Sequence, residues 1–421
     1  MKILVIGSGA REHSLCYAIK RSSLTSTLYA MPGNYGISEI AKCVDINISD
    51  FEKIYEFINS NLIDLVVVGP EEPLVNGIVN FLSDKNIKVF GPDKFAAQLE
   101  GSKGFMKDLC KQNNIPTAAY EKFSNLESAM KYLENQSFPI VIKANGLAAG
   151  KGVTIAEDKK TAEDALQDIF NGKFGPEMDV VIEEFMDGEE ASYFVCCDGQ
   201  DFISLESAQD HKRIGENDEG PNTGGMGAYS PSRLENNELD KKIIEKIIDP
   251  TLKGLRDLNT SFKGFLYAGL MIVNNDPYLI EYNVRMGDPE CQTILPRIKT
   301  DFADIITACV DQNLDSLNLE WSDEKSICIV LCSKGYPEKF KNNIVIKAID
   351  QIKLTEANYI FHAGTKIDNS VVYSNGGRVL NFVIRSSNLK ESREQAINLI
   401  KTLNWENGFF RKDIGYKIIG K

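Results

Sequence analysis

The stretch PIVIKANGLAAGKGVTIAE, residues 139–157, sets a glycine-rich turn between two runs that are typical of β-strands. A Walker loop instead joins a strand to a helix and follows its lysine with Ser or Thr, whereas here Gly152 follows Lys151. A glycine-rich β-hairpin can fold backbone amides over phosphates, and Lys143 on the first strand adds a positive charge. We interpret the stretch as a phosphate-binding hairpin, with a flexible turn that binds nothing as the alternative.

The surroundings of this hairpin predict a compact α+β module. From about residue 118 to 193, the strand-like runs PIVIKA, GVTIAE and DVVIEEF alternate with one helical run, TAEDALQDIF. We expect this module to be a mobile lid.

The N-terminal part predicts a Rossmann-like parallel sheet. KILVI, residues 2–6, is a short buried-strand pattern that ends in Gly7-Ser8-Gly9 before a helical run, and LIDLVVVGPEEPL and IKVFGPD repeat the strand pattern. A dinucleotide-binding fingerprint needs a third glycine where Glu12 stands, which disfavours NAD. A phosphate-bearing substrate at this helix N-terminus is one interpretation, and a tight turn without a ligand is the other.

The remaining chain predicts a body and a separate C-terminal domain. Residues 209–231 form a long glycine-rich polar loop, which inside a compact domain is functional or disordered. A helix over residues 238–258 precedes residues 265–284, which predict two strands joined by an Asn-Asn-Asp turn. From about Ser326 strands dominate, and residues 392–403 are helical. We expect a mainly antiparallel C-terminal domain with a helix.

Two strand ends carry candidate binding residues. In YLIEYNVR the period of two places Glu281, Asn283 and Arg285 on one face, and a carboxylate with an amide oxygen suits Mg²⁺. In IEEFMDGEE the backbone around Glu183, Glu184 and Phe185 can form hydrogen bonds with a flat heterocycle, and Glu190 can accept hydrogen bonds from ribose hydroxyls. An exposed polar face and a solvated acidic turn are the respective alternatives.

Composition excludes several classes of protein. Among 421 residues the net charge is −13, which disfavours nucleic acid as a partner. With only three histidines, a catalytic histidine base or a metal site of several histidines is disfavoured. The nine cysteines are scattered and form no CxxC pair, which suggests reduced, structural thiols. We find no secretory or membrane-spanning pattern and expect a cytoplasmic protein, no membrane partner and a monomer.

An ordered set of motifs closely resembles the phosphoribosylamine–glycine ligases, also called glycinamide ribonucleotide synthetases. The motifs run along nearly the whole chain, and in order they are GSGAREH, VVVGPEEPL, LEGSKGFMK, VIKANGLAAGKGV, IEEFMDGEEAS, QDHKR, GPNTGGMGAYSP, EYNVRMGDPE, HAGT and GGRVL. The resemblance implies an N-terminal substrate domain over 1–101, an ATP-grasp domain over 102–325 with a lid at about 118–193, and a C-terminal domain over 326–421.

The resemblance also assigns residues. It implies that ATP contacts Lys103, Lys143, Gly146, Ala149, Gly150, Lys151, Gly152, Glu183, Glu184, Phe185, Met186 and Glu190, and that Mg²⁺ or Mn²⁺ is held by Glu281 and Asn283. Lys143 and Arg285 are our candidates for catalysis. Our candidates for binding glycine and phosphoribosylamine are Gly9, Arg11, Glu71, Asp210, Lys212, Thr223, Gly224, Gly225, Met226 and Arg285.

Three positions depart from the pattern of this resemblance. Asn145 stands where the family commonly has aspartate, Val284-Arg285-Met286 replaces Cys-Arg-Phe, and YAGLMIV lacks the second metal carboxylate of many ATP-grasp enzymes. The expected reaction joins glycine to phosphoribosylamine through glycyl phosphate. The alternatives are a nicotinamide-dependent oxidoreductase, a non-catalytic nucleotide sensor, and a ligase for another small carboxylate and amine.

Overall fold

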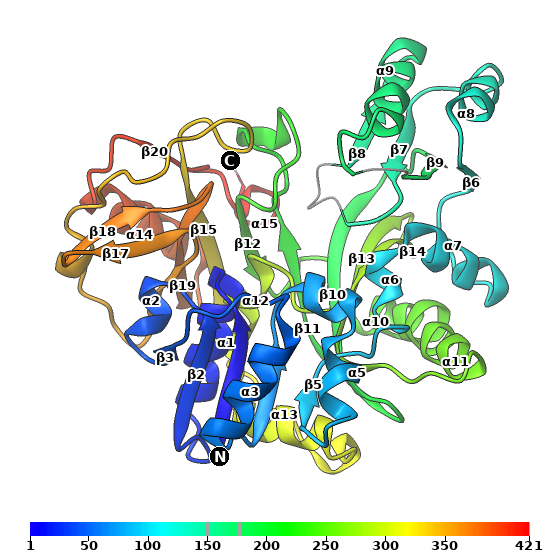
Figure 1. Ribbon diagram of the computed structural model, residues 1–421. Coiled ribbons are helices and arrows are strands. Elements are labelled where there is room, and N and C mark those ends of the chain that lie inside the picture. The colour runs from blue at the N-terminus through cyan, green and yellow to red at the C-terminus, as the bar shows by residue number, and fades with distance from the viewer. Residues whose placement is uncertain (148–151, 176–177, 421) are drawn as a thin grey trace.

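The N-terminal part forms a parallel sheet, as predicted (Figure 1). The computed structural model describes residues 1–147, 152–175 and 178–420. The apolar run at the start of the chain becomes the central strand, because its side chains are buried by neighbours on both faces. The strand order is β3-β2-β1-β4-β5, and the bounds are β1 Lys2–Gly7, β2 Thr27–Pro32, β3 Lys42–Cys43, β4 Leu65–Val68 and β5 Val89–Phe90.

Short helices cover this sheet and lead to the next part of the chain. They are α1 Ala10–Lys20, α2 Tyr35–Ser38, α3 Phe51–Asn61, α4 Glu71–Asn76, α5 Ile78–Ser83, α6 Gln98–Gly101 and α7 Lys103–Gln112. The last of these begins at the cap residue Ser102, whose hydroxyl accepts from the amide of Phe105, and it stops before Pro116 as expected.

A four-stranded antiparallel sheet stands apart from the rest at the top right of Figure 1. Its order is β6-β9-β7-β8, with β6 Tyr120–Phe123, β7 Ile140–Ala144, β8 Val153–Ala156 and β9 Val180–Glu184, and its helices are α8 Leu126–Leu133 and α9 Lys159–Phe170. Sequence patterns missed α8. Residues from Glu189 onward, which the expected lid range includes up to residue 193, pair with strands of a larger sheet.

That larger sheet is antiparallel and runs through both the body and the C-terminal part. Its order is β14-β13-β10-β11-β12-β15-β19-β16, with β20 beside β15. The bounds are β10 Glu189–Asp198, β11 Phe202–Asp210, β12 Gly227–Ser230, β13 Lys263–Val273, β14 Asp276–Asn283, β15 Lys325–Ser333, β16 Asn358–His362, β19 Arg378–Ser386 and β20 Gly408–Phe409, and a separate hairpin holds β17 Thr365–Asp368 and β18 Val371–Ser374. Asn274 and Asn275 make the predicted turn between β13 and β14, both with positive φ.

Helices pack on both sides of the large sheet. They are α10 Asn237–Ile243, a π-helical segment Ile244–Ile248, α11 Asp249–Asp257, α12 Glu290–Ile294, α13 Phe302–Val310, α14 Leu389–Thr402 and α15 Tyr416–Ile419. Short 3₁₀ turns lie at Glu216–Asp218, Leu295–Arg297, Leu314–Ser316 and Ile349–Gln351. Within residues 1–147, 152–175 and 178–420, no helix has the length and apolar composition that crossing a membrane requires.

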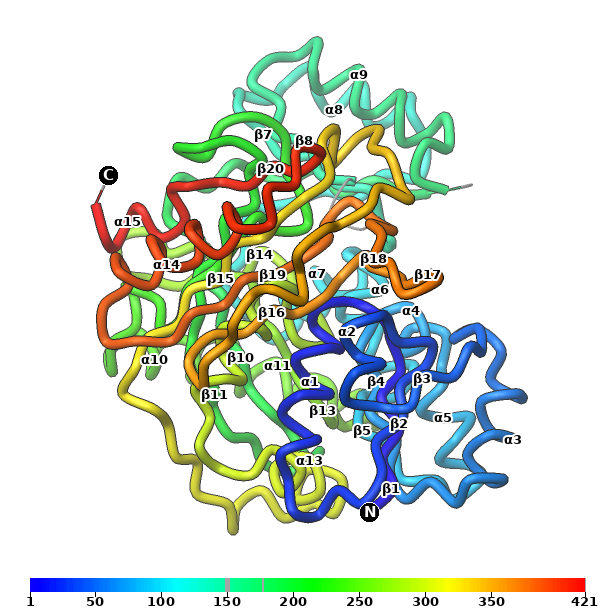
Figure 2. Tube along the Cα trace, turned by 90° about the vertical axis from the view of Figure 1, so that its left-hand side faces the viewer, coloured from blue at the N-terminus to red at the C-terminus, as the bar shows by residue number. Residues whose placement is uncertain are grey.

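Two histidines join the N-terminal and C-terminal parts, which lie against each other in Figure 2. The amide of His362 donates to His13 Nδ1 at 2.8 Å, and His362 Nδ1 lies 2.9 Å from the Thr365 hydroxyl. Gly36 packs so closely on both imidazoles that a Cβ there would lie 2.5 Å from each ring. The GSGAREH and HAGT motifs therefore meet in one interface.

Burial of the histidines predicts acid sensitivity. It lowers the pKa of His211 and His362 to about 4 and that of His13 well below its usual value. In the unfolded chain these histidines bind protons near pH 6.5, whereas in the folded chain they do so only at lower pH. The free energy of unfolding should therefore be at its full value above pH 6.5 and should fall as the pH drops toward 4. The expected loss is up to about 1.4 kcal/mol per pH unit for each histidine, measured by urea unfolding.

The matched control is His362→Asn, which cannot titrate. Its unfolding free energy should fall less steeply between pH 6.5 and 4 than that of the unaltered chain. Equal slopes in the two proteins would contradict the assignment.

Candidate functional site

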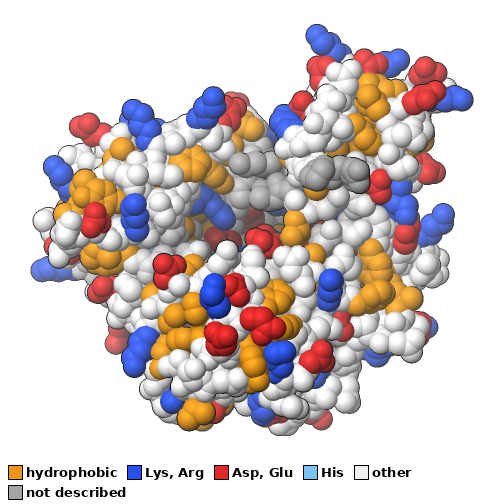
Figure 3. Space-filling model, in the orientation of Figure 1, with side chains coloured by type: hydrophobic (Ala, Val, Ile, Leu, Met, Phe, Trp, Pro, Cys, Tyr) orange, Lys and Arg blue, Asp and Glu red, His pale blue; other side chains and the backbone are white. Residues whose placement is uncertain are grey.

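A cavity of about 390 Å³ lies where the lid sheet, the large sheet and the N-terminal domain meet. Figure 3 shows this face hollowed between the lid and the C-terminal part. It brings together most of the sequence-predicted residues: Arg11, Glu71, Lys103, Lys143, Gly146, Gly152, Glu183, Glu184, Phe185, Met186, Glu190, Asp210, Lys212, Thr223, Gly224, Glu281, Asn283 and Arg285. Gly9, Gly225 and Met226 do not line it, and Ala149, Gly150 and Lys151 lie outside the described residues.

One end of the cavity is apolar. Val141 and Ile155 contribute to its lining from the lid strands, and Met271 and Ile280 contribute from β13 and β14. The segment that follows β9 adds Phe185 and Met186. Two apolar walls with open backbone beside them suit a flat aromatic ring.

Glu183 of the lid sheet pairs with Lys143 of the same sheet and with Lys107 of α7. Its carboxylate lies 2.9 Å from Lys143 Nζ and 3.2 Å from Lys107 Nζ, and all three side chains are buried. Lys143 also donates to the carbonyl of Ile280 at 3.2 Å, so a lid lysine reaches across to β14. The sequence predicted Glu183 as an adenosine contact, and the structure adds its role as the counter-ion of two cations.

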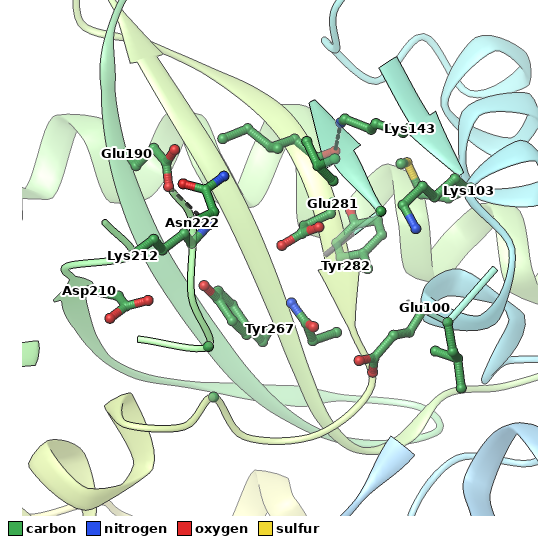
Figure 4. A pocket seen from close by; sticks show the side chains of 18 of the residues that line it. Glu100, Lys103, Lys143, Glu190, Asp210, Lys212, Asn222, Tyr267, Glu281 and Tyr282 are labelled. Atoms are coloured by element: carbon green, nitrogen blue, oxygen red, sulfur yellow. Dashed lines mark hydrogen bonds and ion pairs between the residues drawn. The ribbon is translucent and has the colours of Figure 1, made fainter. Parts of the chain in front are cut away.

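Glu281 points into the middle of the cavity with cations on several sides (Figure 4). Burial opposes its ionisation, but Lys212, Lys143 and other cations outweigh burial and lower the pKa of Glu281. Gly269 lies opposite Glu281 on β13 and supplies no second carboxylate. An ionised carboxylate beside the amide of Asn283 fits one hard divalent cation whose other ligands are phosphate and water oxygens.

This pair is a sparse metal site. Among the residues that the structure describes, no three His, Cys, Asp or Glu side chains gather as a metal-binding group. The donor set therefore fits an ion that arrives with a polyphosphate better than a structural metal.

Arg285 lies between two carboxylates at the N-terminal side of the cavity. Its guanidinium is 3.1 Å from Glu71 and 2.7 Å from Glu100. Burial raises the pKa of Glu100 to about 7, whereas Arg285 and Arg11 overcome burial and lower the pKa of Glu71 to about 2. Both carboxylates pair with Arg285, and Glu71 also lies 3.9 Å from the Arg11 guanidinium.

A second mixed cluster lies on the β11 side. Lys212 Nζ is 2.9 Å from Glu190, as the dashed line in Figure 4 shows. Burial and the charge of Glu290 raise the pKa of Asp210 well above its ordinary value. Glu290 accepts from the Ser192 hydroxyl at 3.1 Å, and that hydroxyl lies 2.9 Å from the Tyr267 hydroxyl. The cluster combines acids with a cation, so it can hold a small zwitterion.

The Gly7–Gly9 turn is not part of this cavity. The Glu12 side chain folds back, so that its carboxylate accepts hydrogen bonds from the Gly9 amide at 2.7 Å and from the Arg11 guanidinium at 2.6 Å. The side chain fills the space above Gly7 and Gly69, where a Cβ would lie 2.3 Å from it. The helix N-terminus that the sequence suggested as a phosphate site is therefore already capped by the carboxylate of Glu12.

Sequence reasoning did not single out several polar lining residues, among them Glu100, Asn222, Tyr267, Asp288, Glu290 and Arg378. All of these except Tyr267 stand inside motifs quoted above, whose composition was the available signal. Tyr267 lies in an apolar strand, which had no pattern that pointed to a site.

Comparisons with known proteins cover the whole length. Family models described as the N domain, the ATP-grasp (A) domain and the C domain of phosphoribosylglycinamide synthetase match residues 1–100, 101–291 and 326–417. A phosphoribosylamine–glycine ligase of Brucella melitensis is 45% identical over 420 residues, which are 100% of this chain and 98% of that protein. The chloroplastic enzyme of the same name from Arabidopsis thaliana is 46% identical over 97% of this chain and 79% of its own.

Solved structures agree with these matches. The crystal structure of phosphoribosylamine–glycine ligase from Thermotoga maritima has a TM-score of 0.86 and 33% identity, and it covers 98% of this chain and 100% of its own. A biotin carboxylase from Campylobacter jejuni has a TM-score of 0.71 at 14% identity, covering 100% of this chain and 95% of its own, which is a likeness of fold alone.

The lysine pair on Glu183 predicts a stability effect. Glu183→Gln removes the only carboxylate within ion-pair distance of Lys107 and Lys143 among the described residues. Because both cations are buried, we expect a loss of about 3–5 kcal/mol in the free energy of unfolding, measured by urea titration. The control is Glu184→Gln, whose exposed side chain can still accept from the Ala119 amide. Equal losses in the two variants would exclude a special role for Glu183.

Proposed function

The chain belongs to the phosphoribosylglycinamide synthetase family, and on that premise we propose that it ligates glycine to 5-phosphoribosylamine. The products are glycinamide ribonucleotide, ADP and phosphate, which makes it a carbon–nitrogen ligase of purine biosynthesis. The observation that carries the proposal is one shared cavity, with Lys143 from the lid hairpin on one wall and Glu281 with Asn283 on the opposite strand. A nucleotide sensor with lost phosphate or metal ligands would lack one of these walls.

ATP is proposed to span the cavity from its apolar end to Glu281. Val141, Ile155 and Phe185 support an adenine ring there, and Glu190 accepts from the ribose. Lys103 and Lys143 neutralise phosphate oxygens, and the hairpin closes over them. Glu281 and Asn283 would hold Mg²⁺ or Mn²⁺, and the ion would offset part of the negative charge of the phosphoryl group that is transferred.

The proposed chemistry needs no protein nucleophile. The glycine carboxylate attacks the γ-phosphorus, so glycyl phosphate forms and ADP leaves. The amine of phosphoribosylamine then attacks the carbonyl carbon, a C–N bond forms, the amine loses a proton and phosphate leaves. Lys143 and Arg285 position the reactants and balance their charge, and a closed lid keeps water from the acyl phosphate.

The small substrates are proposed to bind between two charged clusters. Arg11 and Arg285 lie on one side, and Asp210, Lys212 and the Thr223–Gly224 segment lie on the other. The glycine ammonium and carboxylate match this mixture of acids and cations. Gly9, Gly225 and Met226 do not line the cavity, so they are left out of the proposed substrate contacts.

Four sequence-based predictions stay part of the proposal. They are the division at residues 101 and 325, the monomeric state, the cytoplasmic location and the absence of nucleic acid partners. The nicotinamide-dependent alternative loses its basis, because Glu12 occupies the glycine turn on which that reading rested.

The decisive test is ADP release in the presence and absence of glycine and phosphoribosylamine. We predict that Lys143→Ala lowers glycine-dependent release at least about 100-fold, because a charge aimed at the phosphates is lost. Glu281→Ala should do the same and should also weaken Mn²⁺ binding measured by electron paramagnetic resonance in the presence of ATP. Normal turnover in either folded variant would refute the assigned roles.

Thiol chemistry should play no part. Cys291 is buried beside Ser14, and burial raises the pKa of its thiol far above neutrality. We predict that Cys291→Ala keeps kcat within about twofold, since the scheme needs no thiolate. A folded Cys291→Ala protein without turnover would show that the scheme omits a required group.

A further inference from the structure

The loop between β11 and β12 presents part of the cavity wall. Residues 211–226 include Lys212, Asn222, Thr223 and Gly224, which all line the cavity. The base of the loop is closed by Thr223, whose amide and hydroxyl donate to the carbonyl of Lys212 at 2.7 and 2.9 Å. The position of Lys212 therefore depends on how this loop is held.

The loop has backbone hydrogen bonds of its own, such as that from the Gly215 amide to the Glu219 carbonyl at 2.9 Å, but its tip adopts a conformation that residues with side chains adopt rarely. Asn217 and Asp218 both have φ of 58°, a conformation that costs side-chain-bearing residues about 1 kcal/mol or more each. Such a conformation persists only when surrounding groups support it.

The support comes from the C-terminal segment 411–417. Arg411 is 1% exposed and donates to the carbonyl of Arg213 at 3.0 Å and to Asp218 at 2.8 Å. Asp413 accepts from Arg411 at 2.8 Å and from the amide of Asn217 at 2.7 Å. In Figure 1 the C-terminus and α15 lie beside β12, where this loop returns to the sheet.

Three further contacts complete the support. The Tyr416 hydroxyl and Lys417 Nζ lie 2.9 and 3.1 Å from the Asp218 carboxylate. The amide of Gly415 donates to His211 Nε2 at 3.1 Å, next to Lys212 in the chain. Arg411, Lys417 and Tyr416 overcome burial and lower the pKa of Asp218 to about 2, so the Asp218 carboxylate stays ionised at neutral pH.

We propose that the segment 411–417 is a clamp that positions Lys212 and Thr223–Gly224 for the small substrates, with Arg411 as a positioning residue for the reaction. Arg411, Asp413 and Asp218 do not line the cavity, so they act through the loop. The expected effect on the KM for glycine rests on the proposed function, whereas the support of the loop by the segment 411–417 does not. It also accounts for His211 in the QDHKR motif as a buried acceptor rather than a base.

The kinetic test uses the full chain with Arg411→Met. We expect the KM for glycine to rise about 10-fold to 100-fold, because a displaced Lys212 no longer meets its substrate. The KM for ATP should rise less than the KM for glycine, since the lid and β14 contacts of ATP are intact and only the ion pair of Glu190 with Lys212 is disturbed. Arg411→Lys keeps the positive charge but loses the forked geometry of the guanidinium. Its KM for glycine should therefore lie between those of Arg411→Met and the unaltered chain.

A structural test works without turnover. The loop contains two trypsin sites, Lys212 and Arg213. Cleavage there should be faster in Arg411→Met than in the unaltered chain, as read by mass spectrometry of intact protein and fragments. If the unaltered chain shows no glycine-dependent ADP release, the proposed function fails while this digestion still tests the clamp.

The matched control is Arg385→Met in the same domain. Arg385 donates to the carbonyl of Pro296 at 2.6 Å and lies 2.6 Å from Glu324, so it also joins domains but touches no part of the loop. It should leave the glycine KM and the loop cleavage unchanged. Asp218→Asn serves as a milder second variant, and combined with Arg411→Met it should add little to the single change.

Either of two results would contradict the proposal that the segment 411–417 is a clamp. One is an Arg411→Met protein with unaltered glycine KM and unaltered cleavage at Lys212 and Arg213. The other is a protein whose glycine KM and ATP KM rise equally while Arg385→Met behaves the same way, which would mean general destabilisation.

Discussion

A ladder of antiparallel backbone hydrogen bonds runs from β14 through β10 and β12 into β15 and β16, and the site depends on its register. Glu281 on β14 pairs with Gly269 and Glu190 on β10 pairs with Met271, so these two acids lie on the strands that flank β13 on either side. Because side chains alternate along a strand, a slip of one residue would turn Glu281 to the opposite face. The same ladder places the C-terminal part beside the cavity.

Charge balance is the second constraint on the cavity. Lys143 and Lys107 face Glu183, Arg285 faces Glu71 and Glu100, and Lys212 faces Glu190. Removing such charges from water is unfavourable unless each has a partner, which explains why an otherwise acidic protein keeps so many pairs in one place. The pairing also orients the cations before an anionic substrate arrives, so less of their reorganisation has to accompany binding.

Distant parts of the chain meet around this cavity. The first helix contributes Arg11, the lid contributes Lys143, and the loop after β11 contributes Lys212 under the support of Arg411 near the C-terminus. The His13–His362 contact ties the first domain to the last on another side. The geometry of the small-substrate end thus depends on contacts between segments separated by more than 150 residues, such as Arg411 with Arg213.

Local patterns in the sequence determined much of the architecture and the shared strand face of Glu281 and Asn283. Buried-strand runs predicted the parallel sheet, the Asn-Asn turn predicted the β13–β14 hairpin, and a period of two placed Glu281 with Asn283 on one face. These predictions succeeded because strand period and turn chemistry are local properties of the backbone.

Only the tertiary structure decided the rest. It assigned β10 to the large sheet, turned Glu12 into the partner of Gly9, and brought Glu100 and Tyr267 to the cavity. It also made Lys107 and Arg411 buried ions with distant partners. Period and composition report which face of an element is buried, but which residues meet across that face depends on how separate elements pack, and no local pattern contains that information.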